Sequence, residues 1–387
     1  MEIVFFDDQE IRKALLPLTF TRPVAEIRVG ILTIREKWMF HLISNIFTYQ
    51  TEAYLNVLYP APKKGTLFIN GAVCPSDALR AEIGKLQHGD ALYHKDVLVA
   101  YHSSIKNRVE YEVALTIIQR PADIFANNGA EIKEDYKRIT KVRTSKKIED
   151  KHTLLYNESN IFVEEGVKVR AAIINAEDGP VYLGQNVEIQ EGAIIKGPFA
   201  AMDGSVVAMG ARMRGDITLG PQCKVGGEVS NTVFFGYSNK VHDGFIGNSV
   251  IGEWCNLAAG TNISNLKNNY SEVSVYSYRT GKQENSGRIF HGLVMGDYSR
   301  CGINAMFNTG SVIGTYCNIY DAGFPPKFVP SFAWGSSNGF QEYRLEDAKV
   351  MAARAMERRN KEYTAADSAI AEAIFDLEKT NRQDLLS

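Results

Sequence analysis

The spacing of apolar residues changes character partway along the chain. From Leu183 every sixth residue is apolar at eight positions in a row, namely Leu183, Ile189, Ile195, Ala201, Val207, Met213, Leu219 and Val225. After offsets of two residues the spacing resumes at Phe245, Ile251, Leu257 and Ile263, and again at Met295, Cys301, Phe307, Ile313 and Ile319. A period of six fits neither a helix nor a strand, but it is typical of a solenoid in which each short strand points one side chain inward. The pattern predicts a hexapeptide-repeat solenoid over residues 155–330, with Val163 and Val169 as its first inward positions.

The first part of the chain lacks this period and alternates between strand-like and helix-like segments. Strands are expected at 2–6, 66–70 and 96–102, and helices at 30–46 and 76–86. Such alternation predicts an α/β domain over residues 1–150. The charged, poorly patterned segment 138–153 is expected to be a linker.

The last part of the chain, residues 331–387, is expected to form an extended tail and C-terminal helices. Segment 321–337 is rich in proline, glycine and aromatic residues, which indicates an ordered extended chain. Residues 341–358 and 364–379 have helical spacing, and the second helix has a single apolar stripe. A stripe of this kind indicates a cap on the end of the solenoid or a contact between subunits.

Composition excludes several classes of function. The formal net charge is −2 and no basic block occurs, so nothing favours nucleic-acid binding. No apolar run is long enough to span a membrane, and the acidic start does not look like a signal peptide. The five cysteines show no CxxC pairing, which fits a reducing cytoplasm. The seven histidines form no HxH or HxxxH pair, so no metal site is expected.

Polar residues gather where the six-residue period is offset, in segments 235–247 and 256–275, with a hairpin turn expected near 280–287. Insertions in a solenoid become loops on one face, which is often the binding face. The motifs in order are Arg214, His242 four residues before Ile246-Gly247, Asn256-Leu257-Ala258-Ala259-Gly260-Thr261 followed by Asn265, Met295-Gly296-Asp297, and Gly302-Ile303-Asn304. This pattern resembles the bifunctional N-acetylglucosamine-1-phosphate uridyltransferase/glucosamine-1-phosphate acetyltransferase family, in its variant bacterial members, whose acetyltransferase half is a left-handed parallel β-helix.

The resemblance implies an acetyl-CoA-dependent N-acetyltransferase that acts on an amino-sugar phosphate such as glucosamine-1-phosphate. His242 would be the general base, since an imidazole titrates near neutrality and can take the proton of an attacking amine. The residues implied in substrate binding are Arg214, Phe245, Asn256, Asn265 and Lys267, and those implied in coenzyme A binding are Ala259, Ile303 and Asp321. Phe245 stands where the family has tyrosine, and Ser271 and Ser274 stand where archaeal members have lysine.

The polar face also bears on the oligomeric state of the protein and on alternative roles for its histidines. A solenoid with few cations in each chain could complete its site from a neighbour, which predicts a homotrimer that binds only small molecules. His242 could instead be a solvated loop histidine, and His291 is a second candidate base that also fits a structural role in a strand. The competing function is a non-catalytic trimeric scaffold or a sugar-nucleotide sensor.

The first domain carries a second resemblance. Leu15 to Thr19 and Arg22-Pro23 are similar to the segment that follows the phosphate loop of sugar-phosphate nucleotidyltransferases. This implies nucleotide binding by Arg12, Thr19, Arg22 and Arg28, with Mg²⁺ if the domain is active. Such enzymes need glycines where the backbone approaches phosphate, but segment 6–10 contains the acidic residues Asp7, Asp8 and Glu10, and no glycine precedes Gly30. The sequence leaves open a nucleotidyltransferase and a degenerate domain that binds nucleotide weakly or not at all.

Overall fold

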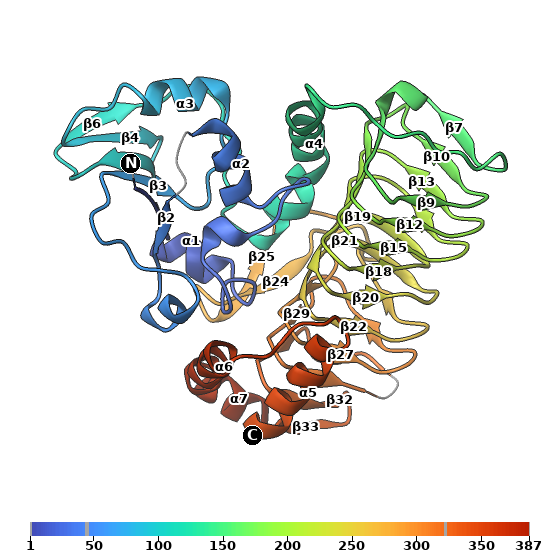
Figure 1. Cartoon of the computed structure of the whole chain (residues 1–387). Helices are drawn as coiled ribbons and strands as arrows, with labels where there is room; N and C mark the ends of the chain where they lie inside the picture. The colour runs from blue at the N-terminus through green and yellow to red at the C-terminus, as the bar shows by residue number, and fades with distance from the viewer. Residues whose placement is uncertain (1, 43–45, 321–322, 387) are drawn as a thin grey trace.

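The computed structural model describes residues 2–42, 46–320 and 323–386. Figure 1 shows an α/β domain at the N-terminus beside a tall stack of short strands, with the C-terminal helices against the last turns of the stack. The observed fold is therefore an α/β domain, a parallel β-solenoid and a helical C-terminal part, as the sequence predicts.

The N-terminal domain is built on a six-stranded sheet in the order β2-β1-β3-β5-β4-β6. Its strands are β1 (Ile3–Phe6), β2 (Phe47–Gln50), β3 (Leu67–Asn70), β4 (Asp90–His94), β5 (Val97–His102) and β6 (Asn107–Glu110). Its helices are α1 (Gln9–Ala14), α2 (Ile34–His41) and α3 (Asp77–Ile83), with short 3₁₀ turns η1 (Val24–Glu26) and η2 (Ala53–Val57). The expected strands at 2–6, 66–70 and 96–102 and the helix capped by Ser76 are confirmed.

The helix expected at 30–46 is shorter than predicted. It begins at Ile34 because Thr33 and Glu36 form a capping box, while Arg28 and Thr33 are paired in a bridge before it. Residues 43–45 lie outside the described residues. The linker expected at 138–153 is also partly wrong, because helix α4 (Pro121–Thr140) extends to Thr140 and buries one face on the solenoid.

Each turn of the solenoid contributes one strand to each of three faces. The first face contains β7 (Leu154–Tyr156), β10 (Ile173–Asn175), β13 (Ile194–Lys196), β16 (Arg212–Met213), the first halves of β19 (Glu228–Gly236) and β21 (Phe245–Glu253), β23 (Asn262–Ile263) and β28 (Met306–Phe307). The second contains β8 (Ile161–Val163), β11 (Val181–Leu183), β14 (Phe199–Ala201), β17 (Ile217–Leu219), the second halves of β19 and β21, β26 (Val294–Met295), β29 (Val312–Ile313) and β31 (Phe328–Val329). The third contains β9 (Lys168–Val169), β12 (Glu188–Ile189), β15 (Val206–Val207), β18 (Lys224–Val225), β20 (Asn239–Lys240), β22 (Asn256–Leu257), β27 (Arg300–Cys301), β30 (Asn318–Ile319) and β32 (Ala333–Ser336), which pairs with β33 (Gly339–Glu342).

The inward column confirms the six-residue period except at one position. All the inward residues expected in the first and third runs, and Val163 and Val169, belong to one buried cluster. The expectation for Phe245 is wrong, because Ile246 is the inward residue, stacked on Val229, and Phe245 points outward. The cause is a shortened corner in two successive turns. Asn231 (φ 43) and Asn248 (φ 48) each form the corner as a single left-handed residue. Successive inward residues on either side of such a corner are therefore one position closer along the chain than the usual six.

The second face of the solenoid is covered by the N-terminal domain and α4. Its outward valines, Val233, Val250, Val294 and Val312, belong to the same apolar cluster as the core of that domain. The expected hairpin forms from β24 (Ser274–Ser277) and β25 (Lys282–Asn285), but its turn lies at 278–281, and residues 282–285 of the segment expected to turn are strand. The hairpin lies in the insertion between β23 and β26.

A ladder of aromatic rings lines the corner between the second and third faces. Tyr237, Trp254, Tyr298, Tyr316 and Phe332 stack from turn to turn with ring-centroid separations of 4.2, 6.3, 4.6 and 4.8 Å. All five have a left-handed backbone with φ between 55 and 62. Helices α5 (Leu345–Glu357) and α6 (Ala365–Leu377) pack on this ladder, which confirms both expected helices, and α7 (Lys379–Leu386) was not foreseen.

Candidate functional site

His242 lies on the corner between the third and first faces, where β20 ends and β21 begins. Its side chain is exposed. The corner of the next turn stacks directly on it, since Gly260 N donates to Asp243 O at 3.1 Å. Gly244 has φ 125, and a Cβ there would lie 2.0 Å from Thr261 O, so this corner requires glycine.

The corner that carries His242 continues through the next turns. Asn304 N donates to Ala259 O at 2.8 Å, which places Ile303 on the same column as Ala259 and His242. Ile303 is 68% exposed. The structure therefore brings together three of the residues that the resemblance implies. Asp321 lies outside the described residues.

Lys240 holds this corner from inside the solenoid. It occupies an inward position opposite Val225, and its Nζ donates to the carbonyl oxygens of His242 and of Asp243, the latter at 2.9 Å. Burial lowers the pKa of Lys240 to about 8, against the opposing influence of Asp243. Residue spacing alone did not mark Lys240 as part of the site, although its position one turn from Val225 was a usable signal.

The first face carries most of the side chains implied in substrate binding. Phe245 N donates to Asn262 Oδ1 at 2.9 Å, and Asn265 Nδ2 donates to Asn248 Oδ1 at 2.8 Å. A Cβ on Gly247 would lie 2.6 Å from Asn265 Nδ2, so glycine there makes room for this amide. The first face thus presents a row of oriented amides beside the His242 corner.

The cations of this face are already engaged. Arg214 Nη1 lies 2.8 Å from Glu228 Oε1, and Lys267 Nζ donates to Ser271 Oγ at 3.3 Å and to Glu272 O. Asn256 lies apart from both, on the third face, where it faces a groove under α5. The expected substrate residues therefore occupy two faces of one chain.

His291 does not belong to this group. It is 2% exposed, its ring packs edge-on against Phe125, and its Nδ1 lies 3.2 Å from Gly292 O. Burial lowers the pKa of His291 to about 4, so the ring stays neutral at physiological pH. Its surroundings fit a structural role.

The expected nucleotide-binding residues of the first domain are buried and hydrogen-bonded within the protein. Arg12 Nη1 lies 2.8 Å from Asp7 Oδ2, and Thr19 Oγ1 donates to Arg12 O at 2.9 Å. Arg28 donates to Ile31 O and Phe235 O. Where a glycine-rich loop would cradle phosphate, Asp8 instead caps α1 through the backbone N–H groups of Glu10 and Ile11.

Arg22 joins the first domain to the solenoid. Its guanidinium donates to both carboxylate oxygens of Asp297, at 3.1 and 2.6 Å, and lies 3.2 Å from Glu253. Burial opposes the charge of Arg22, but Asp297 and Glu253 hold its pKa above the ordinary value. This arginine serves the interface between the two domains.

Within residues 2–42, 46–320 and 323–386, no group of three or more His, Cys, Asp or Glu side chains could hold a metal ion. In the same segments no helix is long and apolar enough to cross a membrane.

The architecture defines a class, an α/β domain docked on a parallel β-solenoid. Residues 3–144 match the model of the family described as sugar nucleotidyl transferase. The bifunctional sugar-1-phosphate nucleotidylyltransferase/acetyltransferase of Sulfurisphaera tokodaii is 34% identical over 169 residues, which are 43% of this chain and 40% of that protein. The chain therefore spans less than half the length of this relative.

Two solved acyltransferase structures resemble this chain only weakly. The polySia-specific acetyltransferase NeuO is 13% identical, with a TM-score of 0.30 over 55% of this chain and 98% of that one. The UDP-N-acetylglucosamine O-acyltransferase of Moraxella catarrhalis is 12% identical, with a TM-score of 0.19 over 61% of this chain and 93% of that one. The solenoid assignment rests on the strand pairing described above.

Proposed function

We propose that the chain is an acyl-CoA-dependent N-acyltransferase that acetylates an amino-sugar phosphate, with His242 as its general base. The observation that carries the proposal is the exposed imidazole of His242, on a corner anchored by Lys240 and beside the oriented amides of Asn262 and Asn265. The name of the Sulfurisphaera tokodaii relative supports acetyl as the acyl group. Glucosamine-1-phosphate is the acceptor that the resemblance implies.

The reaction needs one base, which must later give the proton it has taken to the leaving group. His242 takes a proton from the sugar amine as its nitrogen attacks the thioester carbonyl of the donor. The tetrahedral intermediate collapses, the C–S bond breaks, and the imidazolium returns the proton to the departing thiolate. Ala259 and Ile303, on the same corner in the following turns, would lie along the donor.

The assembly is part of the proposal. Among the described residues, the cations of the first face near His242 are already engaged: Arg212 and Arg214 pair with Glu228, and Lys267 is bonded to Ser271 and Glu272. Phosphate recognition favours arginine or lysine, so a second copy facing the first face would supply what is missing. We propose a homotrimer, as in the family that the sequence resembles, and a cytoplasmic location.

The first domain is proposed to support the solenoid without transferring a nucleotidyl group through Arg12, Thr19, Arg22 or Arg28. Each of these side chains already has partners inside the protein. Mg²⁺ would be needed only if another part of the domain were active. A purely non-catalytic scaffold remains the competing function.

Replacing His242 tests the proposal. His242→Ala should lower the rate of coenzyme A release from acetyl-CoA with amino-sugar phosphates by about 10²- to 10⁴-fold, the usual range for a general base. The side chain is exposed, so thermal stability and the mass by light scattering should not change.

The matched control is His152→Ala, which removes an exposed histidine just before β7 and should keep full activity. A variant at His242 that retains more than about a tenth of the rate would reject the base assignment. Wild-type protein that releases no coenzyme A with any amino-sugar phosphate would favour the scaffold.

A further inference from the structure

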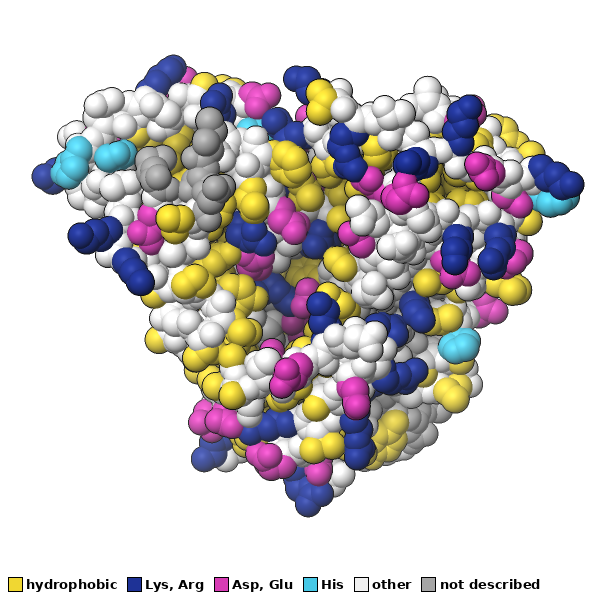
Figure 2. All heavy atoms as spheres, viewed as in Figure 1, with side chains coloured by type: hydrophobic (Ala, Val, Ile, Leu, Met, Phe, Trp, Pro, Cys, Tyr) yellow, Lys and Arg dark blue, Asp and Glu magenta, His cyan; other side chains and the backbone are white. Residues whose placement is uncertain are grey.

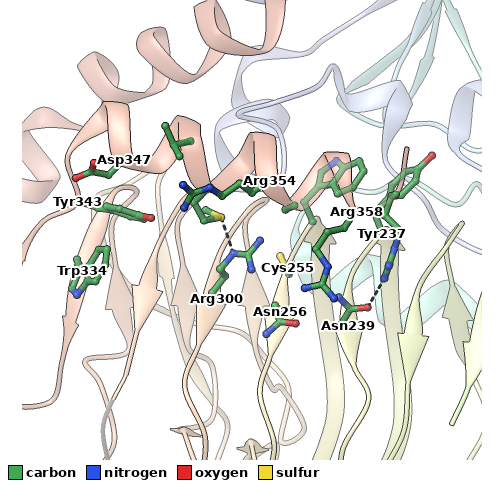
Figure 3. A pocket seen from close by; sticks show the side chains of 15 residues that line it. Tyr237, Asn239, Cys255, Asn256, Arg300, Trp334, Tyr343, Asp347, Arg354 and Arg358 are labelled. Atoms are coloured by element: carbon green, nitrogen blue, oxygen red, sulfur yellow. Dashed lines mark hydrogen bonds between the residues drawn. The ribbon is translucent and has the colours of Figure 1, made fainter. Parts of the chain in front are cut away.

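A groove with several arginines lies between the third face of the solenoid and α5. Its volume is about 590 Å³. Arg300 enters it from β27, Arg354 from the last turn of α5, and Arg358 and Arg359 from the end of that helix. Figure 3 shows the Arg300, Arg354 and Arg358 side chains converging on the groove.

None of these four arginines has a carboxylate within 4.0 Å among the residues that the structure describes. Arg300 Nε is bonded only to Met351 Sδ, at 2.7 Å, and a thioether is a weak acceptor. Arg359 Nη2 donates to Asn239 Oδ1 at 2.9 Å, but its buried Nε has no partner. Asp347, which also lines the groove, pairs with Arg344 instead.

In the described chain, the four arginines outnumber the one carboxylate that lines the groove with them, Asp347. Burial lowers the pKa of Arg300, and burial followed by the charge of Arg358 lowers the pKa of Arg359. The C-terminal end of α5 favours a nearby cation, but a helix end is equivalent to only about half a negative charge. One helix end cannot neutralise four guanidinium groups.

A second cavity, also of about 590 Å³, continues the groove past Tyr237 and shares Arg358 and Arg359 with the first. It adds Lys224 and Lys361, which have no ion pair within the described chain, and the carboxylates of Glu36, which pairs with Arg28, and of Asp203. The combined groove is therefore long and cationic. Figure 2 shows Lys and Arg side chains gathered where the C-terminal helices meet the solenoid.

We infer that this groove binds a small molecule that carries two or more phosphate groups. Guanidinium groups match phosphate oxygens in geometry as well as charge, and several arginines around one cavity favour a polyphosphate over a single carboxylate. A volume of this size suits a nucleotide-sized ligand. Asn256, which the resemblance assigns to the substrate, lines this groove and would contact that ligand instead.

This inference does not depend on the proposed acyl transfer. His242 does not line the groove, so the site is separate from the proposed base. Two sources share the required chemistry: the 3′-phosphorylated ADP part of a coenzyme A donor, and a free nucleoside polyphosphate that acts as an effector. Separate titrations distinguish them.

Isothermal titration calorimetry on the full chain tests the site with adenosine 3′,5′-bisphosphate, UTP and inorganic tripolyphosphate, each without metal. At least one should bind with a dissociation constant of about 100 μM or tighter, and the binding should weaken with added salt. Preference for the bisphosphate identifies the donor part, and preference for UTP or tripolyphosphate identifies an effector.

Substitutions of groove residues test whether the probes bind at this site. Arg300→Gln and Arg358→Gln should each weaken binding by about tenfold or more, because each removes a charge-assisted contact. Arg170→Gln removes an exposed arginine elsewhere on the solenoid and should change the affinity less than about twofold. His242→Ala should bind as the wild type does.

Two results would overturn the inference. One is the absence of binding by all three probes at about 1 mM with folded protein. The other is binding that Arg300→Gln and Arg358→Gln leave unchanged while both variants keep the wild-type melting temperature. Neither result depends on whether the protein transfers an acyl group.

Discussion

At the scale of single residues, the most informative side chain is one that breaks the apolar column. Lys240 occupies an inward position between Val225 and Leu257 in the stack of turns, where the period calls for an apolar residue. An amine there costs desolvation, which its bonds to the carbonyl groups of His242 and Asp243 partly offset. Lys240 therefore stabilises the corner on which His242 lies.

The lowered pKa of Lys240 predicts a pH-dependent stability. Between about pH 8, its value in the folded protein, and the unfolded value near 10.5, the folded state binds fewer protons. Stability therefore rises with pH across this window through Lys240, by less than the ~1.4 kcal/mol per pH unit of one full proton. Urea denaturation at pH 8, 9 and 10 should show that the free energy of unfolding of the wild type increases relative to that of Lys240→Met as pH rises.

The control for this measurement is Lys224→Met, which removes an outward lysine of the preceding turn. Its difference from the wild type should stay constant across the same pH range. A difference between wild type and Lys240→Met that is flat or falls with pH would contradict the account.

Residue periodicity predicted the apolar core of the solenoid but could not reveal the partners of its polar side chains. Every inward position of the uninterrupted runs is correct, because the solenoid repeats one packing problem in each turn. The prediction for Phe245 was wrong because one shortened corner shifts the inward position by a single residue. Neighbouring residues of a strand point to opposite sides, so this shift turns Ile246 inward and Phe245 outward. The partners of Arg214 and Arg22 lie too far along the chain, or in another domain, for spacing to reveal them.

At the scale of elements, the aromatic ladder ties the C-terminal helices to the solenoid. Phe332 ends the ladder, with its ring stacked on Tyr316 and edge-on to Phe375 of α6 at 5.1 Å. The guanidinium of Arg382, from α7, lies 3.9 Å from the Phe375 ring and donates to Phe375 O. The helices therefore cap the last turns, as the apolar stripe of α6 indicated.

Phe332→Ala should loosen this cap. The side chain is fully buried, so its loss should lower the free energy of unfolding by about 3–5 kcal/mol. Hydrogen exchange measured by mass spectrometry should show faster exchange in α6 and α7 and unchanged exchange in β1 and β3. Phe332→Leu is the control and should cost less, because it keeps most of the apolar volume.

Uniform exchange over the whole chain in Phe332→Ala, or no loss of stability, would show that the ladder does not anchor these helices. Helices α4 and α7 were not predicted from the sequence. The start of α4 carried a local signal that was missed, Pro121 at the first helical position followed by Asp123 as the capping residue, whereas α7 owes its position to packing against β33 and α6.

At the scale of the whole molecule, the first domain and the solenoid form one packed unit. The valines of the second face share an apolar cluster with the domain, and Arg22 adds a buried ion pair to Asp297, reinforced by Thr21 Oγ1 at 2.6 Å. Asp297 also accepts from Glu253 N at 2.8 Å, so its carboxylate fixes a solenoid corner as well. Residues similar to a nucleotide-binding motif have here become part of an interface.

Arg22→Ala should weaken the contact between the two domains. It leaves Asp297 buried without its cation, and breaking such a pair by removing one partner typically costs about 3–5 kcal/mol. Limited proteolysis should cleave more rapidly after α4, between Thr140 and β7, because the domain opens away from the solenoid. The control is Arg35→Ala, which removes an ion pair to Glu26 within the first domain and should leave that cleavage rate unchanged. Equal cleavage rates in Arg22→Ala and the wild type would mean that the valine cluster alone holds the domains together.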